Sequence, residues 1–139
     1  MPNKWRPRRF WTKVAIGDSA ECWLWVAGKT GAGYGAYQHE GRLQLAHRVS
    51  WQLAHRRPVP EGKLVLHQCD TPLCVNPNHL WLGSQSDNIR DAAAKGRHHN
   101  TRKTHCKNGH PFDEQNTVRY GRTRWCRLCR LQWQRERIR

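Results

Sequence analysis

The chain has 139 residues, enough for one globular domain with a small appendage, and a formal net charge of +15 from 25 Lys and Arg against 10 Asp and Glu. No apolar run approaches the ~20 residues of a membrane-spanning helix, and the basic start lacks the apolar stretch of a secretory signal. We therefore expect an intracellular protein, in the cytoplasm or in a nucleus. Its expected partner is an acidic polymer and not a membrane.

The positive charge is concentrated at the two ends of the chain. Residues 1–13 contain five Lys or Arg and no acid, and residues 101–139 contain eleven against three acids. This pattern predicts a basic N-terminal extension over 1–13, a folded domain over 14–97 and a basic module over 98–139. We expect the ends to bind phosphates, with Arg6, Arg8 and Arg9 contributing from the N-terminal extension. A solvated tail without a specific role explains the charge about equally well.

The first predicted elements are β-strands. Aromatic and β-branched residues predict a strand over 22–26, and the glycine-rich stretch Gly28 to Gly35 is interpreted as a bend. Residues 34–39 and 42–46 then form a predicted hairpin around the two-residue turn Glu40-Gly41. This turn pairs His39 with Arg42 and Ala36 with Leu45.

The two faces of this hairpin are expected to differ in role. Alternation along the strands places Ala36, Leu43 and Leu45 on the face predicted to join the core. The other face carries long polar donors, which we interpret as candidate readers of DNA base edges: Tyr37, His39, Arg42 and Gln44. An ordinary solvated face is the alternative interpretation.

The remaining elements follow from periodicity and breaker residues. Apolar spacing predicts a helix over 47–57 that ends before Pro58, and short apolar runs predict strands over 64–66 and 80–82. Ser84 or Ser86 is expected to cap a helix that continues to Lys95 and stops at Gly96. Residues 97–105 resemble a linker, and residues 126–139 are compatible with a helix.

The last four metal-ligand candidates have the spacing of a structural zinc site. Two ligand pairs, separated by a predicted short hairpin, make a Cys3His set: Cys106, His110, Cys126 and Cys129. Because a chain without an export signal is expected in a reducing compartment, disulfides are the weaker interpretation. We expect this module to bind zinc.

A second set of ligands lies in the middle of the chain. Cys69, Cys74 and His79 are separated by loops that contain Pro72 and Pro77, and they lack a fourth ligand nearby. Cys22 is the one cysteine left over, so assigning it here uses all six in two Cys3His sites. The alternative is that Cys22 is a small buried hydrophobic residue beside Trp23 and Trp25.

Three stretches of this region form one combined pattern: Leu66-His67-Gln68-Cys69, the run from Cys74 to Leu80, and Ser86-Asp87-Asn88. Together they resemble the HNH (ββα-metal) nucleases, and most closely the His-Cys box homing endonucleases of phages and mobile introns, in whose bacterial hosts the cytoplasm would be the expected location. The resemblance covers roughly residues 20–130, including Cys22 to Trp25 and Ala46-His47-Arg48. It implies an α+β fold with a zinc-stapled ββα core, an N-terminal antiparallel hairpin and a small C-terminal zinc module.

The same resemblance implies the roles of individual residues. His67 would be the general base, since a histidine of pKa about 6.5 is mostly neutral at pH 7. Asn88 would hold one catalytic divalent metal, most plausibly Mg²⁺, and Arg48 is the candidate contact to the scissile phosphate. Some HNH nucleases have an Asp immediately before the base, where this chain has Leu66. Taken singly, His67 fits a buried structural histidine and Asn88 a helix-capping residue.

These observations predict a metal-dependent endonuclease that hydrolyses double-stranded DNA, with two structural Zn²⁺ and one catalytic metal per chain. Cutting both strands at one site would need two active sites and hence a homodimer. The alternative function is a catalytically inert, zinc-stapled DNA-binding regulator. An RNA-directed nuclease is a third option that the sequence leaves open.

Overall fold

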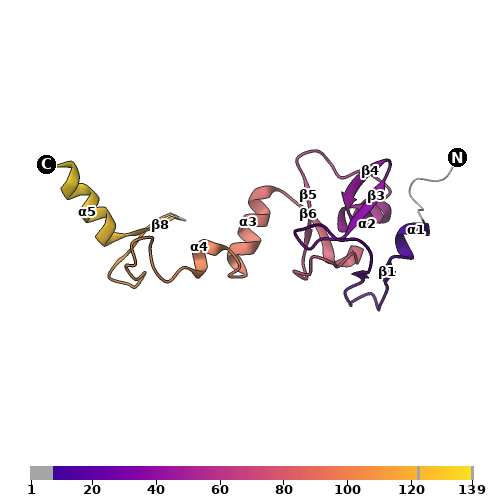
Figure 1. Ribbon diagram of the computed structural model, residues 1–139, viewed down its shortest axis with the longest axis horizontal. Helices are drawn as coiled ribbons and strands as arrows, with labels where there is room; N and C mark the ends of the chain where they lie inside the picture. The colour runs from indigo at the N-terminus through magenta and orange to yellow at the C-terminus, as the bar shows by residue number, and fades with distance from the viewer. Residues whose placement is uncertain (1–7, 122, 139) are drawn as a thin grey trace. The chain divides into compact units, whose positions relative to one another are not determined.

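The computed structural model describes residues 8–121 and 123–138 of the chain. Its contacts divide it into two compact units, of which the first ends at Asn88 and the second begins at Ile89 (Figure 1). The mixture of short antiparallel sheets and helices confirms the predicted α+β class. None of the described helices is both long and apolar enough to cross a membrane.

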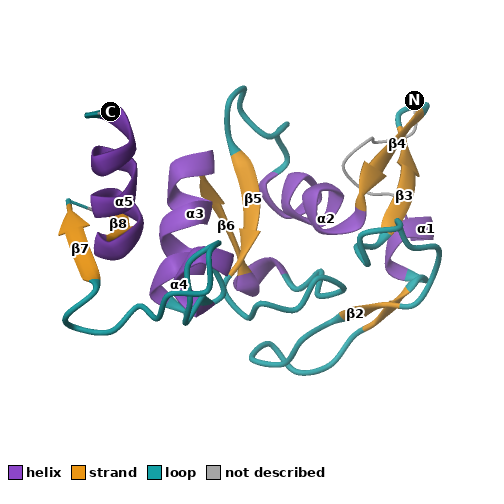
Figure 2. Ribbon diagram, turned by 60° about the vertical axis from the view of Figure 1, so that its left-hand side comes forward, coloured by secondary structure: helices purple, strands orange, loops and turns teal. Residues whose placement is uncertain are grey.

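The first unit consists of short helices and three two-stranded antiparallel sheets, β1-β2, β3-β4 and β5-β6. In chain order its elements are α1 (Arg8–Trp11), β1 (Val14–Ala15), β2 (Leu24–Trp25), β3 (Ala36–His39), β4 (Arg42–Leu45), α2 (Ala46–His55), β5 (Leu64–His67), the 3-10 helix η1 (Pro77–His79) and β6 (Leu80–Gly83). Helix α3 (Gln85–Ala94) follows directly from β6, so that β5, β6 and α3 form the predicted ββα succession (Figure 2).

The second unit is built around one hairpin and one helix. Its elements after α3 are α4 (His99–Arg102), β7 (Thr117–Tyr120), β8 (Thr123–Cys126) and α5 (Arg127–Arg137). The linker prediction for residues 97–105 is wrong where α4 forms. His98 begins this turn because its Nδ1 accepts a hydrogen bond from the Asn100 amide at 3.3 Å, a local cap that the sequence analysis did not recognise.

The register of the β3-β4 hairpin is the predicted one. His39 pairs with Arg42 and Ala36 with Leu45. The turn residues Glu40 and Gly41 have φ values of 50° and 75°. Positive φ at both positions is the type I′ geometry whose twist matches that of the flanking strands.

The predicted faces of this hairpin are reversed. Tyr37 packs against the core, with its ring edge-on to Phe10 at 5.1 Å, and His39 is only 6% exposed. Leu43, which was expected to be buried, is 69% exposed. The large tyrosine ring fills the space beside Phe10 and Trp25 and so determines which face turns inward. Half-buried Tyr37 and buried His39 therefore do not form the exposed polar face on which their base-reading role was predicted.

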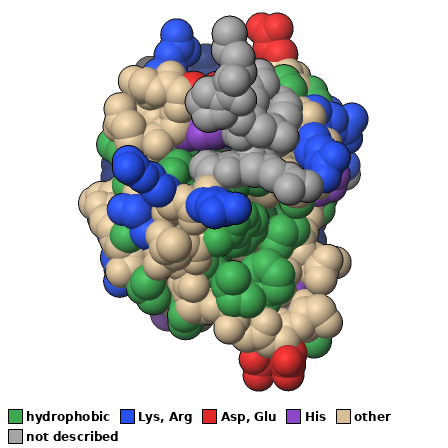
Figure 3. All heavy atoms as spheres, turned by 90° about the vertical axis from the view of Figure 1, so that its right-hand side faces the viewer, with side chains coloured by type: hydrophobic (Ala, Val, Ile, Leu, Met, Phe, Trp, Pro, Cys, Tyr) green, Lys and Arg blue, Asp and Glu red, His purple; other side chains and the backbone are tan. Residues whose placement is uncertain are grey.

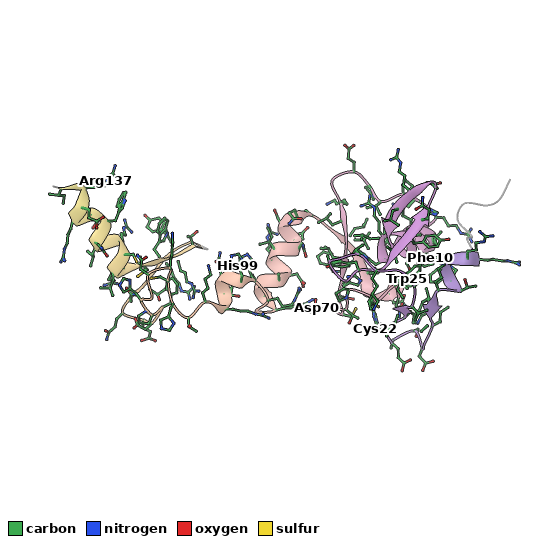
Figure 4. All side chains as sticks on the ribbon, viewed as in Figure 1. Phe10, Cys22, Trp25, Asp70, His99 and Arg137 are labelled. Atoms are coloured by element: carbon green, nitrogen blue, oxygen red, sulfur yellow. The ribbon has the colours of Figure 1, made fainter. Side chains whose placement is uncertain are left out.

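The main core of the first unit is aromatic. Phe10 and Trp25 are 0% and 2% exposed, their rings lie 5.1 Å apart, and Val49 and Leu53 of α2 pack on them (Figure 4). Phe10 belongs to the stretch 1–13 that the sequence analysis treats as a basic extension, yet α1 inserts it into the core. The three-part domain boundaries remain a prediction.

Helix α2 also contacts a second, smaller core. Trp51 projects from α2 into a cluster with Val59, Val65 and Leu80, which holds the β5-β6 sheet. Figure 2 shows α2 between this sheet and the β3-β4 hairpin. The helix therefore fixes the position of β5, at whose end His67 stands.

Candidate active site and metal clusters

The structure brings the four candidate ligands of the first unit together. One ligand atom from each of Cys22, Cys69, Cys74 and His79 lies within 4.8 Å of all the others. Nδ1 of His79 is 3.6 Å from Sγ of Cys22 and 3.5 Å from Sγ of Cys74. Three thiols and one imidazole in this arrangement are a donor set that tetrahedral Zn²⁺ accepts.

The orientation of His79 suits a metal ligand. Its Nε2 donates a hydrogen bond to the Ala20 carbonyl at 3.2 Å, so the proton is on Nε2 and the Nδ1 lone pair faces the thiols. A carbonyl partner on the far ring nitrogen is a common support for ligating histidines. Burial raises the pKa of the Cys74 thiol to about 12, so the thiolate form of Cys74 requires a cation.

Asn76 connects the two chain segments that carry this cluster. The sequence pattern did not indicate this role. Asn76 is fully buried, its Oδ1 accepts from the Asn78 amide at 3.0 Å, and it thereby caps η1, which ends at His79. Its Nδ2 donates to the carbonyls of Ser19 and Glu21, at 2.9 and 2.6 Å. Asn76 thus joins the loop between β5 and η1, which carries Cys69 and Cys74 and is called the metal loop below, to the segment that carries Cys22.

The second cluster has the same composition. Its ligand atoms also lie within 4.8 Å of one another, and they belong to Cys106, His110, Cys126 and Cys129. Nδ1 of His110 is 3.3 Å from Sγ of Cys129. Buried Asn116 supports the cluster, since its Nδ2 donates to Sγ of Cys126 at 3.3 Å and its Oδ1 accepts from the Leu128 amide.

His67 is the last residue of β5 and pairs with Leu80 of β6. Its Nε2 lies 2.8 Å from the carbonyl oxygen of Cys74. Because a carbonyl only accepts, Nε2–H is the donor and Nδ1 retains a lone pair that can take a proton. Burial lowers the pKa of His67, which keeps the ring neutral.

Two further rings pack against His67. The ring of His47 is 4.6 Å from it and that of Tyr34 is 6.2 Å away in a stacked arrangement. His47 is 5% exposed, and its Nδ1 has no hydrogen-bond partner among the described residues. His47 was quoted in the sequence motif without a role of its own. Its position in the first turn of α2 does not by itself reveal the contact with β5.

The buried ring of His47 predicts an acid-dependent loss of stability. Burial, with a smaller effect of nearby His67, lowers the pKa of His47 to about 4. In the unfolded chain a histidine has a pKa of about 6.5, so the unfolded chain binds the extra proton between these values. The free energy of unfolding therefore decreases as the pH falls from 6.5 to 4, by up to about 3 kcal/mol from this residue.

Denaturant unfolding of the wild type and of His47→Gln at pH 7 and pH 5 measures this effect. The variant is expected to lose less stability between the two pH values, because glutamine does not titrate. Acid release of metal is common to both proteins and cancels in the comparison. Equal pH dependence in wild type and His47→Gln would contradict the assignment.

Asn88 lies in the first turns of α3, but it does not cap the helix. Ser84 and Asp87 do so reciprocally: the Asp87 amide donates to Ser84 Oγ at 3.1 Å, and the Ser84 amide donates to Asp87 Oδ2 at 2.8 Å. Asn88 is half-buried, and its side-chain amide has no hydrogen-bond partner among the described residues. The capping explanation for Asn88 therefore fails, and its Oδ1 is uncommitted.

The other candidate residues lie on the surface. Arg48 is half-exposed on α2 beside His47, Arg42 is exposed at the hairpin turn, and Arg8 and Arg9 are exposed on α1. Gln44 accepts a hydrogen bond from Gln52 Nε2 at 3.0 Å, and Arg6 lies outside the described residues. Lys and Arg side chains are spread among hydrophobic ones over the face drawn in Figure 3. The DNA-contacting roles of these residues remain predictions.

A family model described as HNH endonuclease matches residues 44–90, the stretch that contains α2, the β5-β6 sheet, His67 and Asn88. Residues 44–90 are therefore similar to the HNH endonuclease family. The match confirms the predicted resemblance to the HNH nucleases over these residues. Three of the first cluster's ligands lie inside this HNH segment, while Cys22 and the whole second cluster lie outside it.

Two curated relatives extend the similarity beyond the HNH segment. The chain is 39% identical over 83 residues to Protein 2.8 of Escherichia phage T7, covering 58% of this chain and 55% of the relative. It is 40% identical over 77 residues to Protein 7.7 of the same phage, covering 55% and 58%. The chain thus spans about half the length of the curated relatives it matches. No solved structure matches it.

Proposed function

We propose that the protein is a metal-dependent DNA endonuclease of the HNH homing type. The proposal rests on the tautomer and the orientation of the His67 ring. Its Nε2–H is fixed on the Cys74 carbonyl, and its Nδ1 lone pair remains available as a base. The metal loop that contains Cys74 therefore also holds the catalytic histidine in one tautomer and orientation.

The proposed reaction is hydrolysis of one phosphodiester bond. Nδ1 of His67 accepts a proton from water as the water oxygen bonds to phosphorus. The bond from phosphorus to the 3′ oxygen breaks, and this oxygen leaves with a proton from solvent. The products carry a 5′-phosphate and a 3′-hydroxyl. Arg48, beside the His47 that packs on the base, is the proposed cationic contact to the scissile phosphate.

The residues present fit a divalent metal. The uncommitted amide oxygen of Asn88 is a hard ligand of the kind Mg²⁺ prefers, and Leu66 supplies none where some HNH nucleases have an Asp. Mg²⁺ retains several waters in such open sites, so one protein oxygen suffices alongside the substrate. When bound, this metal would stabilise the negative charge that develops during hydrolysis. The two Cys3His clusters would hold structural Zn²⁺.

The net charge of the chain supports the choice of substrate, and the two relatives support the biological setting. The +15 chain supports a polyanionic partner, which we take to be double-stranded DNA. The two T7 relatives support a phage setting within a bacterial host. Cleavage of both strands would require a homodimer. The second candidate, an inert zinc-stapled DNA-binding regulator, is favoured by the strongly basic stretch 101–139.

The ends of the cut DNA distinguish the two candidates and test the chemistry. Incubation of supercoiled plasmid with zinc-loaded protein and Mg²⁺ is expected to produce open circles or linear molecules that DNA ligase reseals without other treatment. Ligase requires a 5′-phosphate and a 3′-hydroxyl, the products of the proposed hydrolysis. Ends that ligase rejects until they are phosphorylated would contradict the mechanism. Binding without any cleavage would favour the regulator.

A further inference from the structure

The second unit contains a groove that adjoins its metal-ligand cluster and that the proposed cleavage reaction does not use. It has a volume of about 1000 Å³ and is formed between the β7-β8 hairpin and one side of α5. Tyr120, Thr123 and Trp125 line it from the hairpin, and Arg130, Trp133 and Glu136 line it from the helix. Its base includes the ligands Cys126 and Cys129, so metal binding would fix the position of its walls.

The aromatic side chains of this groove are unusually exposed. Tyr120 is 77% exposed, and Trp125 and Trp133 are each 55% exposed. None of the described residues of α5 is buried, although the helix has 11 residues and carries Leu128, Leu131 and Trp133. Large aromatic rings left in water on a small module mark a surface that binds something with an apolar face.

The charge around the groove identifies the occupant. Arg130 lines the groove, and the guanidinium of Arg137 lies 4.4 Å from the centre of the Trp133 ring (Figure 4 labels Arg137). Glu136 is the one acidic residue among the described lining residues, and the stretch 101–139 has eleven Lys and Arg against three acids. An apolar protein segment would not require this charge, whereas a nucleic acid combines negative phosphates with flat apolar bases.

We propose that this groove binds unpaired nucleobases of a single strand, which stack on Trp125 and Trp133 while Arg130 contacts the phosphates. In a duplex the base faces are already covered by neighbouring bases, so the flat indole rings favour a single strand. The inference rests on the proposed function only for the choice of a nucleic acid. In this proposal the second unit binds unpaired strands of DNA or RNA.

The test is the affinity of the full, zinc-loaded chain for labelled oligonucleotides, measured by fluorescence anisotropy without Mg²⁺. The probes are oligothymidine, oligouridine and a duplex of equal length. Trp133→Leu, which keeps an apolar side chain but no ring, is expected to weaken single-strand binding by about 5- to 150-fold. Trp133→Phe, which keeps a ring, is expected to retain most of it, and neither change should alter duplex binding comparably.

Two arginine variants that remove the same charge distinguish binding in the groove from general electrostatic attraction. Arg130 lines the groove, while Arg135 lies on another side of α5 with Leu128 and Leu131. Arg130→Ala is expected to weaken single-strand binding more than Arg135→Ala, although both remove one charge. The oligothymidine and oligouridine arms show whether the strand is DNA or RNA.

Three results would overturn the proposal: equal losses for the leucine and phenylalanine variants, equal losses on single strand and duplex, or a change in self-association caused by Trp133→Leu. Because binding is measured without Mg²⁺, a protein that proves inactive as a nuclease still tests the groove.

Discussion

Replacing His67 with alanine is expected to lower the rate of DNA cleavage by ~10²–10⁴-fold, the usual contribution of a positioned general base. The physical reason is the loss of the Nδ1 lone pair, the one proton acceptor that the Cys74 carbonyl holds in place. The rate is measured under single-turnover conditions on a labelled duplex with saturating protein and Mg²⁺. Asn88→Ala is expected to have a similar effect by removing the uncommitted amide oxygen.

The controls for this prediction separate catalysis from binding and folding. The affinity for uncut DNA and the zinc content of His67→Ala are expected to remain close to those of the wild type. His55→Ala, which removes an exposed histidine of α2, is expected to cleave at the wild-type rate. If His67→Ala cleaves normally, the base is another group and the assignment is wrong.

The second large effect is expected from Cys74→Ser, which should unfold or aggregate the first unit. Cys74 is fully buried, and its ligand cluster joins the segment before β2 to the loop after β5. Structural Zn²⁺ contributes about 10–16 kcal/mol of folding free energy in small zinc peptides, more than the usual stability of a whole domain. Elemental analysis of the wild type is expected to show two zinc ions per chain.

Cys126→Ser provides the matched comparison, because it removes a buried ligand from the other unit. It is expected to lose one zinc ion and to weaken DNA binding, while the first unit retains its fold and its remaining zinc. Circular dichroism and zinc analysis of both variants make the comparison. A wild-type protein with one zinc ion or none would contradict the two-site scheme.

Local sequence patterns were sufficient to predict part of this architecture. The register of the β3-β4 hairpin follows from its two-residue turn, and both ligand clusters follow from short cysteine and histidine spacings. Cys22 is the exception among the ligands. It was assigned because no other cysteine remained, and the structure brings it beside His79, 57 residues away in sequence.

The features that the sequence analysis missed depend on long-range packing. Alternation defined two faces of the hairpin, but the fit of Tyr37 against Phe10 and Trp25 determined which one is buried. Phe10 itself lies in a stretch whose charge concealed its core role. Asn76 acts through the Ser19 and Glu21 carbonyls, more than 50 residues away, a distance no local pattern spans.

The metal dependence of plasmid cleavage by zinc-loaded wild-type protein distinguishes the catalytic metal from the structural ones. We propose that His67 and a divalent metal at Asn88 hydrolyse DNA, while zinc only holds the fold. Supercoiled plasmid is expected to remain intact without added metal and to be cut at a rate that rises with Mg²⁺ and saturates. Zinc content measured before and after shows that the structural sites are unchanged. Full-rate cleavage without added Mg²⁺, or no cleavage at any Mg²⁺ concentration by protein that binds DNA and holds two zinc ions, would contradict the account.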